Sequence, residues 1–224
     1  MKKAVCLISG GLDSAVTAYI AKKQRYEIYT ITFRYGQRHK KEIDSAKKIS
    51  KSLESKNHII FDLNLAKFGG SSLVDKKIKI EEHSLNEIGK KIPNTYVPAR
   101  NTIFLSIALA YAEVVEADAI FIGVTATDYS GYPDCRPEFI DSFEKMANLA
   151  TKKSIGGMKI KIKTPLINLS KSEIIRLGSK NNVPFEKTWS CYKGEKKACG
   201  KCDSCKLRLK GFKEAGLTDS IDYR

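Results

Sequence analysis

The feature that most constrains the fold of this chain is a glycine-rich turn near its N-terminus, Ser9–Ser14 (SGGLDS). It follows a short apolar run typical of a buried parallel strand, residues 4–8 (AVCLI), and leads into a helical pattern at residues 14–21. Glycines let backbone N–H groups approach a ligand closely, serine hydroxyls add donors, and a helix N-terminus carries partial positive charge. The segment therefore predicts a cradle for a phosphate or pyrophosphate group.

The loop departs from the usual Walker pattern, because no Gly-Lys-Ser/Thr triplet follows its first glycine. It resembles the SGGxDS loop of the PP-loop ATP pyrophosphatases, which cleave ATP to AMP and pyrophosphate while they activate an oxygen atom of a substrate. The resemblance implies that Asp13 either orients the loop or helps to hold Mg²⁺, and capping of the helix is the alternative role. It implies an ATP site composed of Ile8, Ser9, Gly10, Gly11, Leu12, Asp13, Ser14, Ala15, Val16, Thr17 and Ala18.

Strand and helix patterns alternate along the rest of the chain. Residues 102–115 are apolar almost all round and predict a buried helix, and Ser170 with Glu173 forms a capping-box pattern that starts another. The alternation predicts an α/β fold with a doubly wound, mostly parallel sheet of about five strands. We expect further strands at residues 26–33, 59–61, 119–124 and 158–163, and helices at residues 43–53 and 137–148.

The predicted sheet also places the site. Ligands of doubly wound sheets bind at the carboxyl ends of the strands. We therefore expect the glycine loop to converge there with residues 33–39 and 125–138. Residues 64–98 form a long excursion that no pattern assigns.

Four cysteines lie close together near the C-terminus, separated by seven, two and two residues: Cys191, Cys199, Cys202 and Cys205. Four thiolates at this spacing can hold one tetrahedral zinc ion, and with no free ligand position the zinc would be structural. Disulfides and an iron–sulfur cluster are the alternatives, but a reducing compartment disfavours the first and the spacing of seven does not match ferredoxin patterns. We expect an ATP-binding domain at residues 1–185 and a zinc-binding segment at residues 186–224 packed on it.

Composition narrows the class of protein. The chain has 224 residues, 42% of them hydrophobic and 29% charged, and no apolar run approaches the roughly 20 residues that span a bilayer. Only five apolar residues follow Met1-Lys2-Lys3, too few for a signal peptide, so we expect a cytoplasmic protein without a membrane. The net charge of +15 suits RNA or an anionic substrate, but the lysines are dispersed without interleaved aromatic residues. Charge alone does not decide the partner.

Several longer motifs occur along the chain. They are residues 35–39 (YGQRH), 94–101 (NTYVPARN), 128–139 (DYSGYPDCRPEF), 164–166 (TPL) with Ser170 and Lys171, and 189–192 (WSCY). With the glycine loop and the four cysteines, these motifs resemble the QueC family of queuosine precursor biosynthesis over nearly the whole chain. The loop at residues 128–139 together with the four-cysteine spacing is the most specific match. Two departures from that family are visible: Arg34 stands where Asp is more frequent, and Ala99 where Gly is usual.

The resemblance implies a reaction. The family converts 7-carboxy-7-deazaguanine and ammonia to the 7-cyano compound, a nitrile, and consumes two ATP. The carboxylate and then the amide oxygen would be adenylated, releasing AMP and pyrophosphate each time. We expect that the reaction does not require nucleic acid and that the protein forms a homodimer.

The resemblance also implies site residues. A carboxylate would pair with the N–H donors of the deazaguanine edge while an aromatic ring stacks on it. The implied substrate-binding residues are Asp128, Tyr129, Tyr132, Asp134 and Arg136. The implied catalytic residues, which hold or neutralise phosphate charge, are Ser9, Asp13, Ser14, Arg100 and Lys171, with Arg38 and Lys163 as weaker candidates.

Two other classes fit part of the sequence. Another PP-loop enzyme that acts on tRNA, such as a thiolase or a lysidine synthase, would fit the loop, the charge and the cysteines. It would need an RNA substrate and, for a thiolase, metal-free catalytic cysteines. A non-catalytic zinc-ribbon protein that binds RNA would leave the glycine loop without a role.

Overall fold

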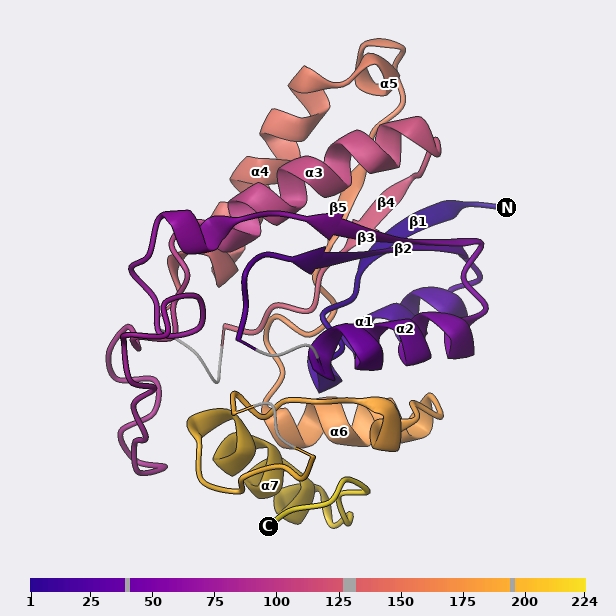
Figure 1. The fold of residues 1–224 in the computed structure, drawn as a ribbon. Helices are drawn as coiled ribbons and strands as arrows, with labels where there is room; N and C mark the ends of the chain where they lie inside the picture. Colours follow the sequence, from indigo (N-terminus) through magenta and orange to yellow (C-terminus); the bar gives the residue numbers. More distant parts are fainter. Residues whose placement is uncertain (39–40, 127–131, 194–195) are drawn as a thin grey trace.

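A computed structural model of the chain describes residues 1–38, 41–126, 132–193 and 196–224 (Figure 1). The strands of these residues are β1 (Lys3–Leu7), β2 (Glu27–Arg34), β3 (Asn57–Asp62), β4 (Ala119–Phe121) and β5 (Lys161–Lys163). The helices are α1 (Leu12–Lys23), α2 (Lys41–Leu53), α3 (Arg100–Val114), α4 (Pro137–Ala150), α5 (Lys152–Ile155), α6 (Lys171–Lys180) and α7 (Asp203–Ala215), with short 3-10 turns at Leu65–Lys67, Pro133–Cys135 and Phe185–Lys187.

The strands form one five-stranded parallel sheet in the order β3-β2-β1-β4-β5. Strand β1 lies at the centre, where Ala4 pairs with Ile28 of β2 and with Ala119 of β4. The chain builds outward from β1 to β3 on one side and then returns to add β4 and β5 on the other. The predicted doubly wound α/β fold is confirmed, and the strand order reverses between β1 and β4, where such folds bind ligands.

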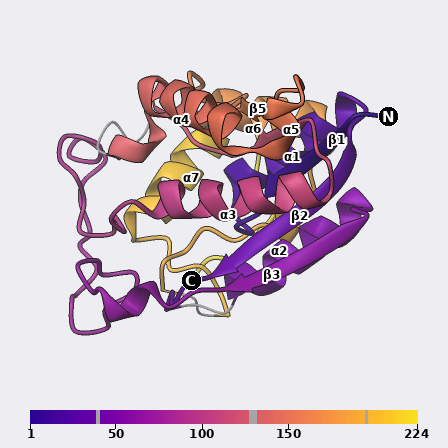
Figure 2. The same ribbon diagram turned by 90° about the horizontal axis from the view of Figure 1, so that it is seen from above.

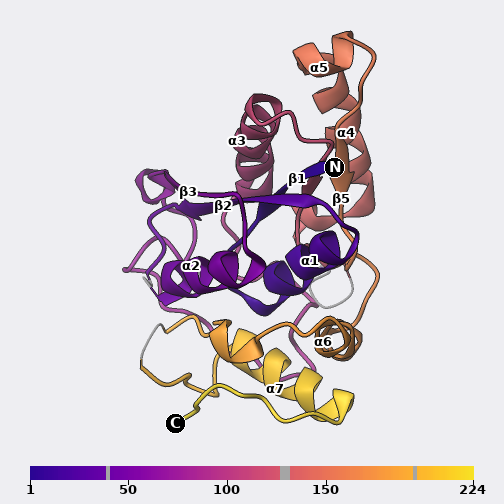
Figure 3. The same ribbon diagram turned by 90° about the vertical axis from the view of Figure 1, so that its right-hand side faces the viewer.

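Helices cover both faces of the sheet (Figures 2 and 3). Helices α3 and α4 pack on one face, in a core that includes Val5, Ile120 and Leu105. Helices α1 and α2 cover the other face, and α6 and α7 form a further layer beyond them. Apolar side chains on both faces of the strands enter these two cores, which explains the near-continuous apolar runs of the parallel strands.

Several predicted elements differ in detail. Strands β4 and β5 keep only three residues each of the six expected, because the chain leaves the ladder at the ligand-binding edge and at residues 158–160. Helix α3 is not buried all round: one side packs on the sheet and Val114 on the other is 79% exposed. The capping box of Ser170 and Glu173 is formed as predicted.

The excursion between β3 and α3 runs past the carboxyl edge of the sheet to the C-terminal segment. Two carbonyl oxygens, of Asp75 and Ile78, accept hydrogen bonds from the Arg38 guanidinium. Farther along, His83 contacts Asp203 at the start of α7 through both its backbone N–H and its ring. Within the described residues, no helix has the length and apolar character needed to cross a membrane.

Candidate active site and metal centre

The glycine loop connects the carboxyl end of β1 to α1 and is held by its own serines. The Ser14 hydroxyl lies 3.0 Å from Ser9 Oγ and donates to the Gly11 carbonyl at 3.0 Å, and it accepts from the Ser9 N–H at 3.2 Å. Gly10 has φ +87°, and a Cβ there would lie 2.1 Å from the backbone oxygen of Glu42. Glycine is required at this position because of both its conformation and the close approach of α2.

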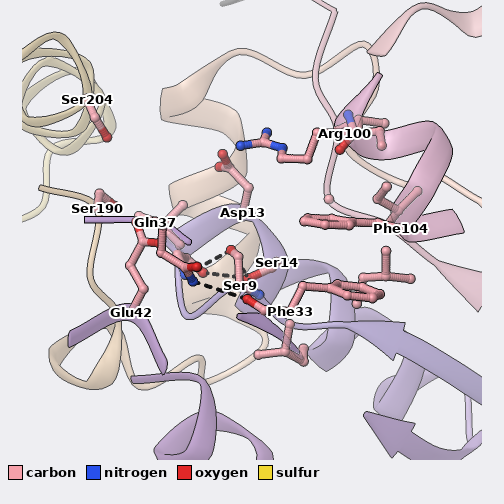
Figure 4. A pocket seen from close by; sticks show the side chains of 18 of the residues that line it. Ser9, Asp13, Ser14, Phe33, Gln37, Glu42, Arg100, Phe104, Ser190 and Ser204 are labelled. Atoms are coloured by element: carbon pink, nitrogen blue, oxygen red, sulfur yellow. Dashed lines mark hydrogen bonds between the residues drawn. The ribbon is translucent and has the colours of Figure 1, made fainter. Parts of the chain in front are cut away.

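A cavity of about 270 Å³ opens beside this loop (Figure 4). Its walls come from the carboxyl ends of β1, β2 and β4, the first turns of α2 and α3, and the C-terminal segment. The predicted convergence of the loop with the residues after β2 and β4 is therefore present. Phe33 and Phe104 stack with ring centroids 4.0 Å apart and form an apolar side of the cavity.

Residues 8–18, implied to bind ATP, divide into three groups. Those that line the cavity are Ile8, Ser9, Gly11, Leu12, Asp13 and Ser14. Gly10 forms the turn of the loop, and the Trp189 N–H donates to its carbonyl at 2.8 Å. The remaining residues, Ala15, Val16, Thr17 and Ala18, are buried within α1.

The two implied catalytic residues Asp13 and Lys171 are joined. Lys171 Nζ, at the start of α6, lies 2.8 Å from both carboxylate oxygens of Asp13. The N-cap residue of α1 is Gly11, and no side chain caps this helix. Asp13 thus neither caps α1 nor presents a free carboxylate; its ion pair ties the glycine loop to α6.

Arg100 begins α3 and lines the cavity. Its Cζ lies 5.9 Å from the centre of the Tyr35 ring. Burial opposes the charge, but Tyr35 and other acidic neighbours raise the pKa of Arg100, so the guanidinium stays cationic. Figure 4 shows this guanidinium and the Asp13 carboxylate pointing towards one another at the mouth of the loop. Ala99, which precedes Arg100, has φ +52°, a left-handed conformation that glycine adopts more easily.

The implied substrate-binding residues are dispersed. Tyr132 lines the cavity, with its ring stacked on Tyr96 and its hydroxyl 3.1 Å from Thr95 Oγ1. Asp134 is buried outside the cavity lining and accepts the Asn101 N–H at 2.9 Å, which anchors the start of α3. Arg136 is exposed and precedes α4. Asp128 and Tyr129 lie outside the described residues.

The other candidates lie elsewhere. Lys163 is exposed at the end of β5. The Arg38 guanidinium donates hydrogen bonds to the carbonyl oxygens of Asp75 and Ile78 in the excursion. Arg34 pairs with Asp62 of β3 at 2.9 Å and does not line the cavity, so this departure from the family leaves the site intact.

The sequence reasoning missed Glu42, Phe104, Ser190 and Ser204 as cavity residues. Burial raises the pKa of Glu42 to about 7, although the Arg100 charge works in the opposite direction. The available signal was a carboxylate in the first turn of the helix that follows β2, at the ligand-binding edge of the sheet. The two serines carried no signal, because they reach the cavity only through the packing of the C-terminal segment.

The four cysteine sulfurs lie within 4.8 Å of one another and all four residues are buried. A tetrahedral zinc ion with bonds of about 2.3 Å places its sulfurs about 3.8 Å apart, and the Cys199 and Cys205 sulfurs are separated by 3.9 Å. No disulfide joins these residues. Backbone N–H groups of Lys193 and Cys199 point at Cys191 Sγ, each at 3.4 Å, which suits a thiolate. The residues therefore fit a four-coordinate metal site.

The metal centre and the cavity share one segment. Trp189, Ser190 and Tyr192 line the cavity immediately before and after Cys191. Trp189 is 4% exposed and carries Lys41 Nζ over its ring, 3.4 Å from the centroid. Cys135, outside the cluster, also lines the cavity; burial raises the pKa of its thiol to about 12, so it is protonated at neutral pH.

Comparisons with known proteins identify the relatives of this chain. The family model described as "Queuosine biosynthesis protein QueC" matches residues 3–216. The chain is 55% identical to the 7-cyano-7-deazaguanine synthase of Acetivibrio thermocellus, over 100% of this chain and 98% of that protein. It is 54% identical to the protein of the same name from Hydrogenovibrio crunogenus, over 100% and 96%.

Solved structures support the fold at greater distance. NMN synthetase from Francisella tularensis aligns with a TM-score of 0.51 and 19% identity, covering 98% of this chain and 79% of that one. A predicted subunit of tRNA methyltransferase from Methanocaldococcus jannaschii aligns with a TM-score of 0.52 and 19% identity, covering 98% and 90%. At this identity the likeness concerns the fold alone.

Proposed function

This chain belongs to the QueC family of queuosine biosynthesis proteins, and we propose on that basis that it converts 7-carboxy-7-deazaguanine and ammonia to 7-cyano-7-deazaguanine with ATP. Identity above 50% over the full length of curated synthases supports the activity. A tRNA-modifying activity is not favoured, because these similar proteins carry the synthase name. The structural observation that supports the proposal is the cavity beside the SGGLDS loop.

The loop would hold the phosphates of ATP. Ser9 and Ser14 supply hydroxyls, the start of α1 supplies backbone N–H groups, and the helix dipole favours an anion there. Arg100 at the cavity wall would neutralise charge that develops as pyrophosphate departs. Asp13 and Lys171 would keep the loop in place through their ion pair.

The chemistry explains why ATP is needed twice. A carboxylate is a poor acyl donor because oxide is a poor leaving group, so adenylation gives ammonia an acyl group that it can attack. Adenylation of the resulting amide oxygen turns the loss of water into the loss of AMP and leaves the nitrile. The chain's own residues mainly hold charges and orient the reacting groups.

The base, the metals and the assembly complete the proposal. Tyr132 would stack on the deazaguanine ring, and the loop that holds Asp128 and Tyr129 would supply its remaining contacts. Mg²⁺ would accompany the ATP phosphates, and the four cysteines would hold one structural zinc ion. A homodimer and a cytoplasmic location stay predictions; light scattering and cell fractionation test them.

One incubation tests the function. Purified protein, 7-carboxy-7-deazaguanine, ammonium and Mg-ATP, without RNA, should give the nitrile by mass spectrometry. Two AMP and two pyrophosphate should appear for each nitrile. Formation of ADP and orthophosphate would contradict cleavage of ATP between its α and β phosphates. A requirement for tRNA would favour the tRNA-modifying class.

A further inference from the structure

Glu42 presents a carboxylate to the cavity, and the phosphate contacts proposed for Ser9, Ser14 and Arg100 do not involve it. It stands in the first turn of α2, whose backbone is pressed against Gly10 of the loop. Its side chain lines the same cavity as Ser9 and Ser14, and Figure 4 places it on the opposite side of the loop from Arg100. Among the residues that the structure describes, none forms a hydrogen bond or ion pair with this carboxylate.

The proposed reaction needs a proton acceptor beside nitrogen. Ammonium, the main form of ammonia at neutral pH, carries four N–H protons, and the nitrile nitrogen carries none. One proton leaves before attack, because ammonium has no lone pair. A second leaves after the C–N bond forms and AMP departs, and the last two leave as the adenylated amide eliminates AMP. The nitrogen therefore passes all four protons to acceptors in or near the cavity.

Several other titratable groups of the described cavity are unsuited to this task. Both oxygens of Asp13 contact Lys171. Burial raises the pKa of the Tyr35 and Tyr132 hydroxyls and that of the Cys135 thiol, so these groups keep their protons at neutral pH. Glu42 is the remaining carboxylate of the described lining.

We propose that Glu42 binds the incoming ammonium ion beside the glycine loop and accepts its proton, so that ammonia is released next to the adenylated carboxyl group. The carboxylate takes one proton from ammonium, and the nitrogen lone pair that this frees forms the C–N bond as AMP leaves with the C–O electrons. This inference rests on the proposed function and deepens it by assigning the ammonia site.

The surroundings of Glu42 suit a group that both takes and returns a proton. Burial raises its pKa to about 7. Among the described residues, the charged and titratable groups that act on it are Arg100 from α3, Tyr35 after β2 and Cys191 from the C-terminal segment. Arg100 favours the carboxylate, whereas Cys191 opposes it. A base with a pKa near the operating pH transfers protons most effectively.

The test separates ammonia use from adenylation. Glu42→Gln keeps the shape of the side chain and removes the base, and Asp44→Asn, on the exposed side of the same helix, is the matched control. With acid and Mg-ATP but no ammonium, exchange of labelled pyrophosphate into ATP reports adenylation alone. We expect Glu42→Gln to keep this exchange within about twofold while nitrile formation at pH 7 falls by about 100-fold.

The pH profile provides a second readout. At fixed total ammonium the wild-type rate should rise with pH through about 7 as Glu42 loses its proton. The Glu42→Gln deficit should shrink at alkaline pH, because free ammonia then enters already deprotonated. Asp44→Asn should follow the wild type throughout.

Distinct outcomes would overturn the inference. Equal losses of exchange and nitrile formation, or a matching rise in the KM for Mg-ATP, would assign Glu42 to a metal or phosphate. Unchanged ammonium kinetics in Glu42→Gln would make it a bystander. If Glu42→Gln does not fold, Glu42→Asp carries the test, since a retracted carboxylate should raise the KM for ammonium and not that for ATP. Absence of nitrile and of exchange in the wild type would instead reject the proposed function.

Discussion

The hydroxyl of Ser14 holds the glycine loop closed in this structure. It contacts Ser9 and the Gly11 carbonyl, and it would turn towards phosphate when ATP binds. We expect Ser14→Ala to lower kcat by about ten- to a thousandfold, because it removes a donor to the leaving pyrophosphate. Steady-state release of pyrophosphate measures this, with Ser106→Ala on the exposed side of α3 as the control. A kcat equal to that of the wild type would exclude Ser14 as a donor.

Ala99 carries a local conformational cost where it joins the excursion to α3. Its φ of +52° is left-handed, which disfavours a residue with a Cβ by about 1 kcal/mol. We expect Ala99→Gly to raise the free energy of unfolding by up to about 1 kcal/mol, whereas Ala110→Gly inside the same helix should lower it by about as much. Urea unfolding curves of both variants check the signs. A loss of stability in Ala99→Gly would be inconsistent with strain at this position.

At the level of elements, the contact between the glycine loop and α2 depends on one missing Cβ. Gly10 and Gly157 both have positive φ, +87° and +84°, but a Cβ at Gly157 meets nothing within 4 Å. Gly157→Ala should therefore cost only the backbone strain of about 1 kcal/mol. Gly10→Ala adds the clash with α2, so it should lower the free energy of unfolding several times more. It should also weaken ATP binding. Thermal melts and ATP titration measure both; equal costs would mean that the loop yields freely.

The excursion is fastened to α7 by a titratable contact. The hydrogen bond with Asp203 raises the pKa of His83 above its ordinary value of 6.5. Because the folded-state pKa is the higher one, the stabilisation is complete below about 6.5 and is lost as the pH rises through the folded-state pKa. We expect residues 76–92 to become more susceptible to limited proteolysis with rising pH in that window. His83→Gln should abolish the pH dependence; its persistence would point to another group.

For the whole molecule, the metal centre and the cavity are parts of one structure. Buried Arg208 of α7 binds Asp219 at 2.6 and 2.8 Å and donates to Thr188. The contact with Thr188 fastens α7 to the segment directly before Cys191. Since that segment also walls the cavity, a metal ion bound by the four cysteines should support ligand binding as well as folding, without contacting the reacting atoms.

We expect about one zinc ion per colourless chain. Cys202→Ser or chelation should remove stability on the order of 10 kcal/mol at most, perturb Trp189 fluorescence and weaken ATP binding. Metal analysis, melting curves and ATP titration measure these effects, with Cys6→Ala, far from the cluster, as the control. Bound iron with visible absorption would indicate an iron–sulfur cluster at this site in place of zinc. A stable Cys202→Ser protein that binds both substrates but makes no nitrile would make the cysteines catalytic.

The sequence by itself determined the local features. Apolar runs, the capping box at Ser170, the glycine loop and the cysteine spacing each act within a few residues, so the α/β fold and the four-cysteine cluster could be recognised without coordinates. The lengths of β4 and β5 could not, because a strand ends where its neighbour stops pairing and not where its apolar pattern stops.

Only the tertiary structure decided which distant side chains meet. Asp13 and Lys171 are 158 positions apart and pair across two elements, and Asp134 is drawn away from the cavity to the start of α3. Glu42 reaches the cavity because Gly10 lets α2 approach the loop. Such meetings depend on how helices pack on the sheet, and packing is a long-range property that spacing along the chain does not encode locally.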